Sequence, residues 1–434
     1  MRTIKVLTFV GAFGWGGTER QFVNLGLGLD PSRFAVHFGC LRRFGVMLEE
    51  LEASGVPVID YDVLSLRSFR AIAAQIRLVR DIRRLGIDVV HTYGFHSHVF
   101  AIPAAKLAGA SVIASIRDMG VYLSSSQRIV QRWFCRFADQ ILVNAAAIKE
   151  WLVADGYDAD RISVIPNGID LSRFPQHAGR GVLRAELGLI ADAPLVAVLG
   201  RVSRMKGLED FLAAAAIVAP RFPKARFCII GEPSFTTRGR KILVDGTYEA
   251  ELKRLAASLG LQERVIFTGF RSDVAQILPE LSVSVLPSLS EGLSNTLLES
   301  MAAGVPVVAT RVGGTAEVVQ DLENGLLVPP GDPSSLAEAI CRYLDAPAFA
   351  AQMGSAARRR IFERYSMHTL VENTSRVYES LIDCGDAPLT RPSATLSPLR
   401  GARDLTREIL LPAKRGEGAA KRRMRGRGVP GEQG

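Results

Sequence analysis

Short apolar runs recur along the chain, and each ends at a glycine or another turn residue. Segments with the apolar spacing of an amphipathic helix separate these runs. Continuous β-rich runs that alternate with helices indicate parallel sheets covered on both faces. The predicted strands occupy residues 4–10, 34–40, 56–61, 87–93, 111–116, 140–144, 162–166, 195–200, 226–231, 264–269, 282–288 and 305–310. Twelve strands are more than one sheet usually holds, so the pattern predicts an α/β protein with two doubly wound, Rossmann-like domains.

The strand pattern is interrupted near the middle of the chain, and this break sets the expected domain boundary. Residues 171–181 carry proline, glycine and charges without an apolar period. The prediction is a first domain over residues 1–178, a second over 179–358 and helices at 359–384 that pack back towards the first domain. Two open α/β sheets in this arrangement bind ligands in the cleft outside the carboxyl ends of their strands.

Composition changes this picture mainly at the carboxyl terminus. The 434 residues carry a formal net charge of +9 and are 48% apolar, which is a globular balance. Residues 385–434 hold 11 Lys and Arg against 5 Asp and Glu, so this basic tail contributes +6 of the total. Its Pro, Gly and Arg content predicts disorder. Aromatic residues do not interleave with its basic blocks, which argues against specific nucleic-acid binding.

Cysteine use and the length of the apolar runs bear on location. The five cysteines are scattered and never spaced as C-x-x-C, which favours buried free thiols in a reducing compartment. The first apolar run breaks at Gly11 and resembles a strand more than a signal peptide. No uncharged apolar stretch reaches the ~18 residues that a spanning helix needs. The expected location is cytoplasmic.

Two arginine-bearing segments leave contact with a membrane surface open. Residues 66–86 and 128–137 combine arginines with apolar residues, as interfacial helices attracted to anionic lipid do. The same segments suit ordinary amphipathic helices packed on the first sheet. The first interpretation would place the protein peripherally on the inner face of the cell membrane, and both are retained.

Two glycine-containing motifs at strand ends are candidates for binding anions. In the segment 14–19, Gly16 and Gly17 let the backbone approach a ligand closely, at the start of a helix whose N-terminus favours an anion. Glu19 stands where the dinucleotide fingerprint has its third glycine, so a Rossmann oxidoreductase is disfavoured. Arg201 and Lys206 follow the first strand of the second domain, where two cations suit a diphosphate.

The third and most specific motif joins a strand, a glycine-containing loop, a helix and another strand. Glu291 precedes Gly292 in the loop, and Ser294 can cap a helix that begins near Asn295. Glu299 lies about one turn into that helix. The amides of the helix N-terminus suit phosphate or sugar oxygens, and carboxylates accept hydrogen bonds from vicinal hydroxyls. The motif therefore points to a sugar bound beside a phosphate.

Taken together, these motifs resemble the retaining GT-B glycosyltransferases of family 4, which include many bacterial polysaccharide and glycolipid transferases. The resemblance covers about residues 3–382 and rests on GWGGTE (14–19), DVVHTY (88–93), VIPNGIDLSRF (164–174), LGRVSRMKG (199–207), VIFTGFRSDV (265–274), the E-x7-E segment (291–299) and NGLLVPPGDPSSLAEAI (324–340). It implies a GT-B fold, in which an acceptor-side domain and a nucleotide-sugar-binding domain face each other across a cleft.

The resemblance also implies roles for individual residues. Arg201 and Lys206 would hold the donor diphosphate, and Glu291 would bind the transferred sugar, as the catalytic set. The implied substrate-binding residues are Gly16 and Gly17 at the donor phosphate and acceptor, Gly269 and Phe270 beside the nucleobase, Glu299 on the ribose, and Gly292, Leu293, Ser294 and Asn295 around the sugar. The implied donor is a uridine or guanosine diphosphate sugar, and the implied acceptor is lipid-linked or a saccharide. Neither a cofactor nor a metal is expected.

One position departs from the family pattern. Many relatives carry a histidine where this chain has Arg117, and arginine cannot act as a base because it stays protonated. Arg117 instead suits donor hydroxyls or an acceptor phosphate. His91, at the end of the neighbouring strand, is a second candidate for polar contact with substrate. The D-x-D strings at 60–62 and 158–160 are expected in surface turns.

Two rival functions use similar folds. A non-hydrolysing nucleotide-sugar epimerase also has two such domains, but it is not expected to carry the E-x7-E segment. A catalytically inactive sugar-nucleotide-binding protein is disfavoured because Arg201, Lys206, Glu291 and Glu299 occur together. Arg117 keeps that second alternative open.

Overall fold

The computed structural model describes residues 2–14, 16–175, 181–190, 192–233, 235–238 and 241–383, without the side chains of 235–238 and 241–244. The basic tail expected at 385–434 lies outside these residues. The described cysteines are free and buried, as predicted: Cys40, Cys135, Cys228 and Cys341. Within the described chain, no helix combines the length and the apolar character needed to cross a membrane.

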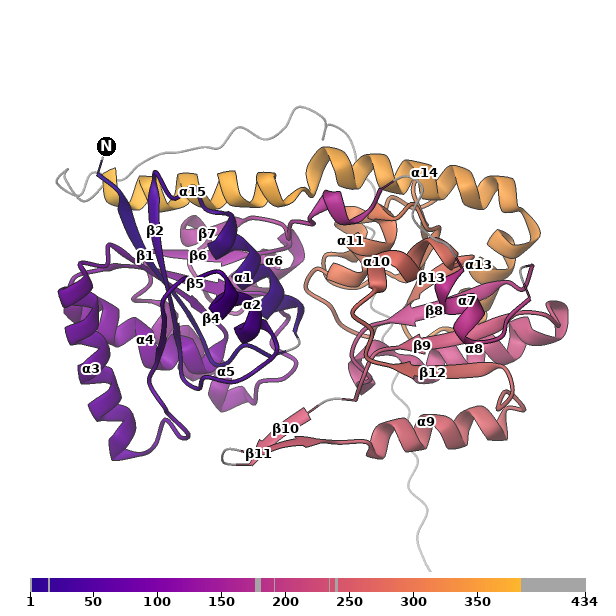
Figure 1. Ribbon diagram of the computed structural model, residues 1–434, viewed down its shortest axis with the longest axis horizontal. Coiled ribbons are helices and arrows are strands. Elements are labelled where there is room, and N and C mark those ends of the chain that lie inside the picture. The colour runs from indigo at the N-terminus through magenta and orange to yellow at the C-terminus, as the bar shows by residue number, and fades with distance from the viewer. Residues whose placement is uncertain are drawn as a thin grey trace, which may run out of the picture. The chain divides into compact units, whose positions relative to one another are not determined.

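The first domain is built on a seven-stranded parallel sheet (Figure 1). Its strands are β1 (Ile4–Val10), β2 (Phe34–Cys40), β3 (Val58–Asp60), β4 (Val89–Tyr93), β5 (Ser111–Ile116), β6 (Gln140–Val143) and β7 (Ile162–Val164). Their spatial order is β3-β2-β1-β4-β5-β6-β7, so the order reverses between β1 and β4. Ligands of open parallel sheets bind at such a reversal, outside the carboxyl ends of the strands.

Helices cover both faces of this sheet, which explains why its strands read as continuous apolar runs. They are α1 (Gly17–Gly28), α2 (Met47–Ala53), α3 (Phe69–Leu85), α4 (Phe95–Ala108), α5 (Ser125–Cys135) and α6 (Ala146–Ala154), with the 3-10 turns η1 (Ala159–Arg161) and η2 (Leu171–Arg173). Buried side chains of α3 to α6 share one core with the sheet. Those of α1 and α2 belong to cores on its other face.

The second domain has a six-stranded parallel sheet in the order β12-β9-β8-β13-β14-β15. Its strands are β8 (Leu195–Leu199), β9 (Arg226–Ile230), β12 (Val265–Gly269), β13 (Val283–Leu286), β14 (Val307–Thr310) and β15 (Leu326–Val328). Here the order reverses between β8 and β13, and the motif residues after these two strands therefore lie at a second ligand-binding reversal.

Helices also cover both faces of the second sheet. They are α7 (Val182–Glu186), α8 (Leu208–Arg221), α9 (Thr247–Ser258), α10 (Val274–Ile277), α11 (Asn295–Ala302), α12 (Thr315–Val318) and α13 (Pro333–Asp345), with η3 (Arg204–Lys206) and η4 (Leu278–Glu280). Buried residues of α8, α9 and α13 share one core, and those of α7, α10, α11 and α12 share another.

Two long helices, α14 (Pro347–Arg364) and α15 (Met367–Asp383), close the described chain (Figure 1). α14 packs into the second domain through Ala357 and Ile361. α15 packs on the first domain, where Leu370 and Tyr378 join the core beneath β1. The return towards the first domain therefore begins at Met367, later than the expected residue 359.

All twelve predicted strands are present, and the described residues contain three further strands that were not predicted. β15 is a three-residue edge strand paired only with β14, which is too short to stand out as an apolar run. β10 (Phe235–Arg238) and β11 (Lys241–Val244) form a separate antiparallel pair. Their sequences mix polar and charged residues with apolar ones, so the run pattern did not reveal them.

Candidate functional site

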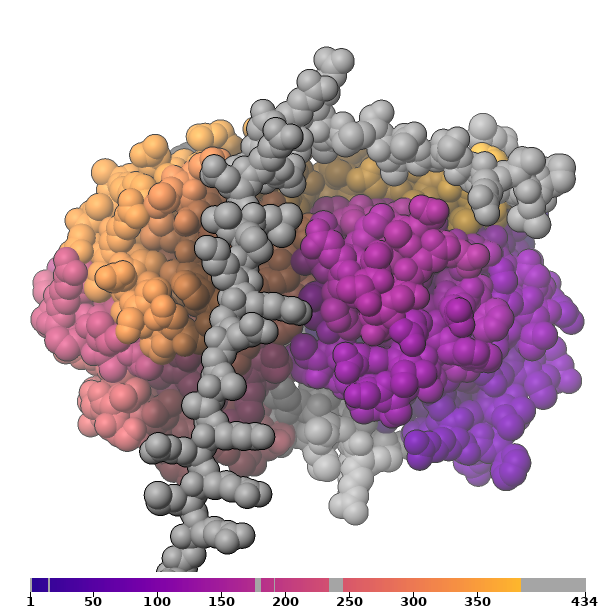
Figure 2. Space-filling model, turned by 180° about the vertical axis from the view of Figure 1, so that it is seen from behind, coloured from indigo at the N-terminus to yellow at the C-terminus, as the bar shows by residue number. Residues whose placement is uncertain are grey.

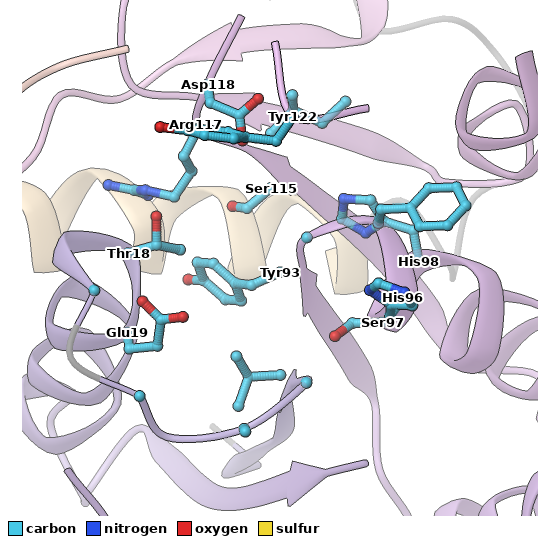
Figure 3. Close-up of a pocket in the computed structure, with 18 of the residues that line it drawn as sticks. Thr18, Glu19, Tyr93, His96, Ser97, His98, Ser115, Arg117, Asp118 and Tyr122 are labelled. Atoms are coloured by element: carbon cyan, nitrogen blue, oxygen red, sulfur yellow. The ribbon is translucent and has the colours of Figure 1, made fainter. Parts of the chain in front are cut away.

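A cavity of about 500 Å³ opens at the carboxyl edge of the first sheet, where β1 and β4 end (Figure 3). The loop after β1, the residues after β2 and β4, and the end of β5 form its walls. The second domain contributes Arg201, which follows β8. Four predicted site residues line the cavity: Gly16, Gly17, Arg117 and Arg201. The lining thus draws on both domains, as expected of a ligand-binding cleft.

The glycine loop is shaped by two close approaches. Gly16 precedes the first turn of α1, and a Cβ there would overlap the Glu19 carboxylate. A Cβ on Gly17 would lie 3.0 Å from Nδ2 of Asn295. Burial raises the pKa of Glu19, and the positive charge of Arg201 opposes that shift. Side chains at positions 16 and 17 would therefore displace the Glu19 carboxylate and crowd the Asn295 amide group.

Lys206 and Glu291, both predicted as catalytic, contact each other directly. The Lys206 Nζ atom lies 2.5 Å from Glu291 Oε1, and the Ser288 hydroxyl donates to the same oxygen at 2.6 Å. The lysine and glutamate side chains are 19% and 12% exposed. Because an ammonium group has three donors, Lys206 can hold a phosphate oxygen while it stays paired with Glu291.

A positive backbone φ at Gly207 allows this pairing. Its φ is +60°, and a Cβ would overlap the carbonyl oxygen of Pro287. The chain after β8 can therefore pass close to the chain after the neighbouring strand β13. This contact brings the cation of one motif to the carboxylate of the other.

α11 begins at Asn295, as predicted, and the Ser294 hydroxyl accepts a hydrogen bond from the Leu297 amide at 3.4 Å. The loop before it lies against the first domain, because a Cβ on Gly292 would overlap the Arg117 carbonyl oxygen. Gly314 donates its amide to the Gly292 carbonyl at 2.7 Å. The helix N-terminus and its positive dipole end are thus held at the interface of the two domains.

A polar network of side chains crosses that interface. Asn295 donates from Nδ2 to the Gly17 carbonyl at 2.9 Å and accepts at Oδ1 from Asn167 at 2.6 Å. Gln21 of α1 also donates to Asn295 Oδ1, at 3.3 Å. Arg117 donates to the Oδ1 atom of Asn167. The Asn295 side chain therefore holds the glycine loop, and the sugar contact predicted for the Asn295 backbone stays a prediction.

Arg117 lines the cavity at the end of β5, where the family pattern has histidine. Burial lowers the pKa of its guanidinium from the ordinary value of 12.5, and it remains a cation at neutral pH. Asp118 lines the same wall, and burial raises the pKa of its carboxyl. Arg117 is therefore placed to bind an anion or a hydroxyl.

His91 lies inside the fold and not in the cavity lining. It is 1% exposed, and its ring nitrogens lie 2.8 Å from the Tyr378 hydroxyl and 2.8 Å from the Ser115 hydroxyl. Burial lowers its pKa well below the ordinary value, so the ring is neutral. The structure therefore argues against the expected contact of His91 with substrate, because Nδ1 bonds Tyr378 of α15 and Nε2 bonds Ser115 of the neighbouring strand β5.

Glu299 is half-buried in α11 and lies outside the cavity lining. Burial raises the pKa of its carboxyl, and the positive charges of Arg20 and Arg173 oppose that shift. Both arginines belong to the first domain, so Glu299 faces the domain interface. Its contact with a donor ribose stays a prediction.

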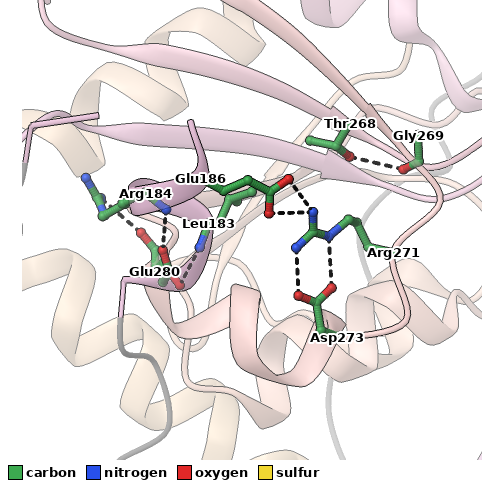
Figure 4. Close-up of polar contacts among 8 residues, drawn as sticks. All are labelled: Leu183, Arg184, Glu186, Thr268, Gly269, Arg271, Asp273 and Glu280. Atoms are coloured by element: carbon green, nitrogen blue, oxygen red, sulfur yellow. Dashed lines mark hydrogen bonds and ion pairs between the residues drawn. The ribbon is translucent and has the colours of Figure 1, made fainter. Parts of the chain in front are cut away.

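Gly269 ends β12, as Figure 4 shows, and Phe270 follows it. Both residues were predicted beside the nucleobase, and both lie outside the cavity lining. Gly269 has φ +69°, and Phe270 is 40% exposed. The next residue, Arg271, is fixed by paired contacts to Glu186 at 2.7 Å and to Asp273 at 2.7 and 2.9 Å. These contacts fix the turn after β12 that contains Phe270. The contact of Phe270 with a nucleobase stays a prediction.

The D-x-D string 158–160 forms an exposed turn, as predicted, whereas 60–62 begins at the last residue of β3 and contains the buried Tyr61. The Asp62 amide donates to the Asp60 carboxylate at 2.9 Å, and the Asp160 amide donates to the Asp158 carboxylate at 3.1 Å. Across the described chain, no cluster of three or more His, Cys, Asp or Glu side chains is suited to a metal ion.

Sequence reasoning missed several residues that shape the site. Asn167 lies within the segment 164–174, and Ser288 lies three residues before Glu291. Their place in or beside these motifs could have marked them as candidates. Glu317 gave no such signal, because it lies in the four-residue helix α12. Its carboxylate nevertheless accepts from the amides of Ala146 and Ala147, at 2.8 and 2.9 Å, and so caps α6 of the other domain.

Known families match both domains. The family model described as Glycosyltransferase Family 4 matches residues 15–173, and the model described as Glycosyl transferases group 1 matches residues 180–360. A D-inositol 3-phosphate glycosyltransferase of Streptomyces scabiei is 33% identical over 310 residues, which cover 67% of each chain. An Escherichia coli UDP-Gal:alpha-D-GlcNAc-diphosphoundecaprenol alpha-1,3-galactosyltransferase is 28% identical over 313 residues, covering 67% of this chain and 78% of that protein.

Solved structures of other proteins have a fold similar to that of this chain. The crystal structure of Anabaena HepE in complex with UDP and glucose superposes with a TM-score of 0.77 at 23% identity. The superposition covers 87% of this chain and 100% of that one.

Proposed function

Since this chain belongs to glycosyltransferase family 4 and has the GT-B fold, we propose that it transfers a sugar from a nucleoside diphosphate to an acceptor hydroxyl with retention of configuration. The observation that carries this proposal is the Lys206–Glu291 pair beside the N-terminus of α11. A cation, a carboxylate and backbone amides converge there. Together they suit the diphosphate and the hydroxyls of a nucleotide sugar.

The proposed catalysis is electrostatic. Negative charge develops on the leaving diphosphate as its bond to the sugar weakens, and groups already aimed at that charge lower the barrier. Lys206, Arg201 and the amides before α11 would supply them, with Glu291 orienting both the lysine and a sugar hydroxyl. These cations would take the place of a divalent metal, so the proposed transfer proceeds in the presence of a chelator.

Retention requires the acceptor to approach the face of the sugar that the diphosphate leaves. In the proposed step the bond from the anomeric carbon to the phosphate oxygen breaks while the bond to the acceptor oxygen forms. The acceptor proton passes to the leaving phosphate oxygen. Arg117, which stands where relatives have histidine, is protonated and would bind substrate without acting as a base.

The names and bound ligands of similar proteins suggest which donor and which acceptor the enzyme uses. The E. coli protein carries UDP-Gal and a diphosphoundecaprenol-linked sugar in its name, and HepE was crystallised with UDP. The Streptomyces relative is named for an inositol phosphate. We therefore place a uridine diphosphate sugar ahead of a guanosine diphosphate sugar as the donor. A lipid-linked or saccharide acceptor would assign the enzyme to bacterial polysaccharide or glycolipid synthesis.

A lysine exchange with a matched control tests the proposal. Lys206→Ala removes the cation at the leaving group and should lower the transfer rate about 10²-fold or more. Lys224→Ala removes a surface lysine paired with Asp192 at 2.7 Å and should leave the rate unchanged. A panel of nucleotide sugars, screened by thermal shift and then by product analysis, identifies the donor for this comparison. Near-normal transfer by Lys206→Ala would refute the assignment.

Product analysis also separates the rival functions. A nucleotide-sugar epimerase converts its substrate without an acceptor, whereas the proposed enzyme forms a new glycosidic bond with an unchanged anomeric configuration. A catalytically inactive binding protein would bind the nucleotide sugar and release no nucleoside diphosphate in the presence of any acceptor.

The first domain also has an exposed apolar surface that fits an anionic membrane. On α3, Phe69, Ile72 and Ile76 are exposed on the side away from the buried Ala71 and Leu78. The helix therefore packs on the sheet and still leaves an apolar stripe. Arginines border this stripe: Arg70, Arg77, Arg80, Arg83 and Arg84.

α5 repeats this arrangement on the same face of the first sheet. Its exposed apolar residues include Ile129 and Trp133, and the exposed Arg136 and Phe137 follow its last residue. Figure 2 views the first domain from the side of its purple and magenta segments, which include α4 to α6. Apolar stripes bordered by arginine are typical of interfacial helices on anionic lipid. We place the enzyme in the cytoplasm, peripherally on the membrane, and its free cysteines fit that compartment.

Vesicle flotation tests this placement. The full chain should float with anionic vesicles and much less with neutral ones, and Trp133→Ala should weaken the binding. Val153→Ala, an exposed apolar exchange on α6, serves as the control. Equal and negligible flotation with both lipids would reject the membrane contact and leave the transferase proposal intact.

A further inference from the structure

The cavity is lined by a group of anion-binding elements that is separate from Lys206 and Glu291, which lie outside its lining. We propose that the start of α4, with Ser97 and Arg42, binds a phosphate group carried by the acceptor. The inference rests on the proposed transfer, because it assigns a charged group to the acceptor of that reaction. It does not involve the residues proposed to hold the donor diphosphate.

The start of α4 leaves donors directed at the cavity. The helix has 14 residues, and its N-cap, Gly94, has φ +80° and no side chain that could cap the amides. The first helical hydrogen bond runs from the His98 amide to the Gly94 carbonyl at 3.0 Å. The amides of Phe95, His96 and Ser97 precede that bond and have no acceptor within the helix. A Cβ on Gly94 would meet nothing within 4 Å, so a ligand has room there.

Ser97 supplies an independent sign of a ligand. It is 0% exposed and lines the cavity, and its hydroxyl has no hydrogen-bond partner among the described residues. Figure 3 shows its oxygen directed into the space enclosed by the lining residues. Leaving a buried hydroxyl unsatisfied is unfavourable. A bound phosphate oxygen at the first turn of α4 would provide the acceptor it lacks.

Arg42 adds a cation at the same wall. It follows β2, is half-buried and lines the cavity, with its guanidinium carbon 4.8 Å from the centre of the Phe44 ring. Burial and the positive charge of Arg42 lower the pKa of His96 in the first turn of α4. The guanidinium therefore acts electrostatically on the helix start. A guanidinium is well shaped to contact two phosphate oxygens at once.

The overall charge of the cavity also favours a dianion. Arg42, Arg117 and Arg201 line it, against the carboxyl groups of Glu19 and Asp118. Burial raises the pKa of both carboxyls, and the three guanidinium groups outnumber them. Three backbone amides, a hydroxyl and a guanidinium provide more donors than a carboxylate needs. They match the several acceptor sites of a phosphate group.

The two proposed phosphate-binding groups line one cavity but belong to different domains. Arg201, proposed to hold the donor diphosphate, lines the same cavity from the second domain, and the glycine loop lies in the lining with it. A phosphate at α4 would anchor the acceptor on the first domain while its hydroxyl reaches towards the donor sugar. Both a soluble polyol phosphate and a lipid-linked diphosphate carry the required group.

Calorimetry tests the site. Inorganic phosphate is titrated into the full chain in the presence of saturating uridine diphosphate. Arg42→Gln should weaken phosphate binding about tenfold or more, and Ser97→Ala about threefold or more. Arg43→Gln is the matched control, because the neighbouring Arg43 pairs with Glu52 at 2.7 Å and does not line the cavity. The control should bind phosphate within twofold of the wild type. Every variant should bind uridine diphosphate as the wild type does.

Two results would overturn the inference. One is unchanged phosphate binding in both Arg42→Gln and Ser97→Ala. The other is loss of phosphate binding in Lys206→Ala alone, which would place the anion in the donor site. If the wild type binds no nucleoside diphosphate, the proposed transfer fails, and phosphate binding measured without nucleotide still tests the α4 site by the same variants.

Competition distinguishes the sources of the phosphate. Glycerol 3-phosphate and a short polyprenyl diphosphate in detergent micelles should each displace inorganic phosphate if the site recognises only the phosphate group. Displacement by only one of them identifies a soluble or a lipid-linked acceptor, and both outcomes support the site. Displacement by neither, while inorganic phosphate binds, would contradict an acceptor role.

Discussion

The Nδ2 atom of Asn295 donates a hydrogen bond to the carbonyl oxygen of Gly17 at 2.9 Å. This bond joins the first turn of α11 in the second domain to the glycine loop of the first. Asn295 also accepts from Asn167 at 2.6 Å, so one side chain ties two segments of the first domain to the donor side. The relative placement of the glycine loop and the Lys206–Glu291 pair therefore depends on Asn295.

Replacing Asn295 should loosen this connection. In Asn295→Ala the donors of Asn167 and Gln21 lose an acceptor, which should lower the free energy of unfolding by about 1–3 kcal/mol. Transfer should fall at least about tenfold, because small misplacements of reacting groups are costly. Urea unfolding and initial rates measure the two effects. Asn373→Ala, on the outer helix α15, is the control, and equal behaviour of the two variants would contradict the prediction.

The loop that contains Gly292 should not tolerate a side chain. A Cβ would overlap the Arg117 carbonyl oxygen, and because that atom is backbone the two domains would have to separate. Gly292→Ala should therefore lower transfer about 10²-fold, with far-ultraviolet circular dichroism unchanged. Gly246→Ala is matched, since its φ is −77° and a Cβ there meets nothing within 4 Å. Wild-type rates in Gly292→Ala would show that the close approach is not needed for catalysis.

The Glu317 carboxylate should stabilise the contact between the domains. It accepts from the Ala146 and Ala147 amides and lies at the positive end of the α6 dipole. Glu317→Ala should lower the melting temperature, with a loss of up to about 2 kcal/mol for a partly buried helix contact. Glu317→Gln keeps an acceptor without the charge and should lie between. Glu323→Ala, an exposed exchange, is the control. An unchanged melting temperature in Glu317→Ala would remove this contact from the account of stability.

Buried histidines should make the fold less stable as the pH falls below neutrality. Burial lowers the pKa of His98 to about 3. The unfolded chain protonates this ring near pH ~6.5, so between these values the unfolded state binds the extra proton and stability rises with pH. Each such histidine should cost up to about 1.4 kcal/mol per pH unit as the pH drops from 6.5 to 5.

Urea unfolding at pH 7, 6 and 5 measures this slope. His98→Asn should reduce it by about one proton relative to the wild type. Buried carboxyls with raised pKa, such as Glu19 and Glu299, titrate in the opposite sense, so the variant is compared with the wild type at each pH. Parallel curves for wild type and variant would mean that His98 is not the group responsible.

Local sequence was enough to find twelve of the described strands and several site residues. The helix after Ser294 and the D-x-D turn at 158–160 follow from capping and turn chemistry, which act within a few residues. Arg201 was placed in a cleft because ligands of parallel sheets bind at the carboxyl ends of the strands, and it does line the cavity. Apolar runs located every long strand for the same reason, since strands buried on both faces must be apolar throughout.

Contacts between segments far apart in the sequence could not be predicted from local sequence patterns. His91 was expected to contact substrate from the end of the first sheet, but the return of α15 brings Tyr378 onto it, and it is buried. Nothing near Glu317 in the sequence indicates that it caps a helix of the other domain.

The sequence alone determined the two parallel sheets, the cationic and acidic motifs at their strand ends and the family, because strand burial, capping and motif spacing are local properties of the chain. Only the tertiary structure decided that Lys206 pairs with Glu291, that Asn295 holds the glycine loop and that His91 is enclosed. These outcomes depend on how two domains and a returning helix pack, and packing is a property of surfaces assembled from residues hundreds of positions apart.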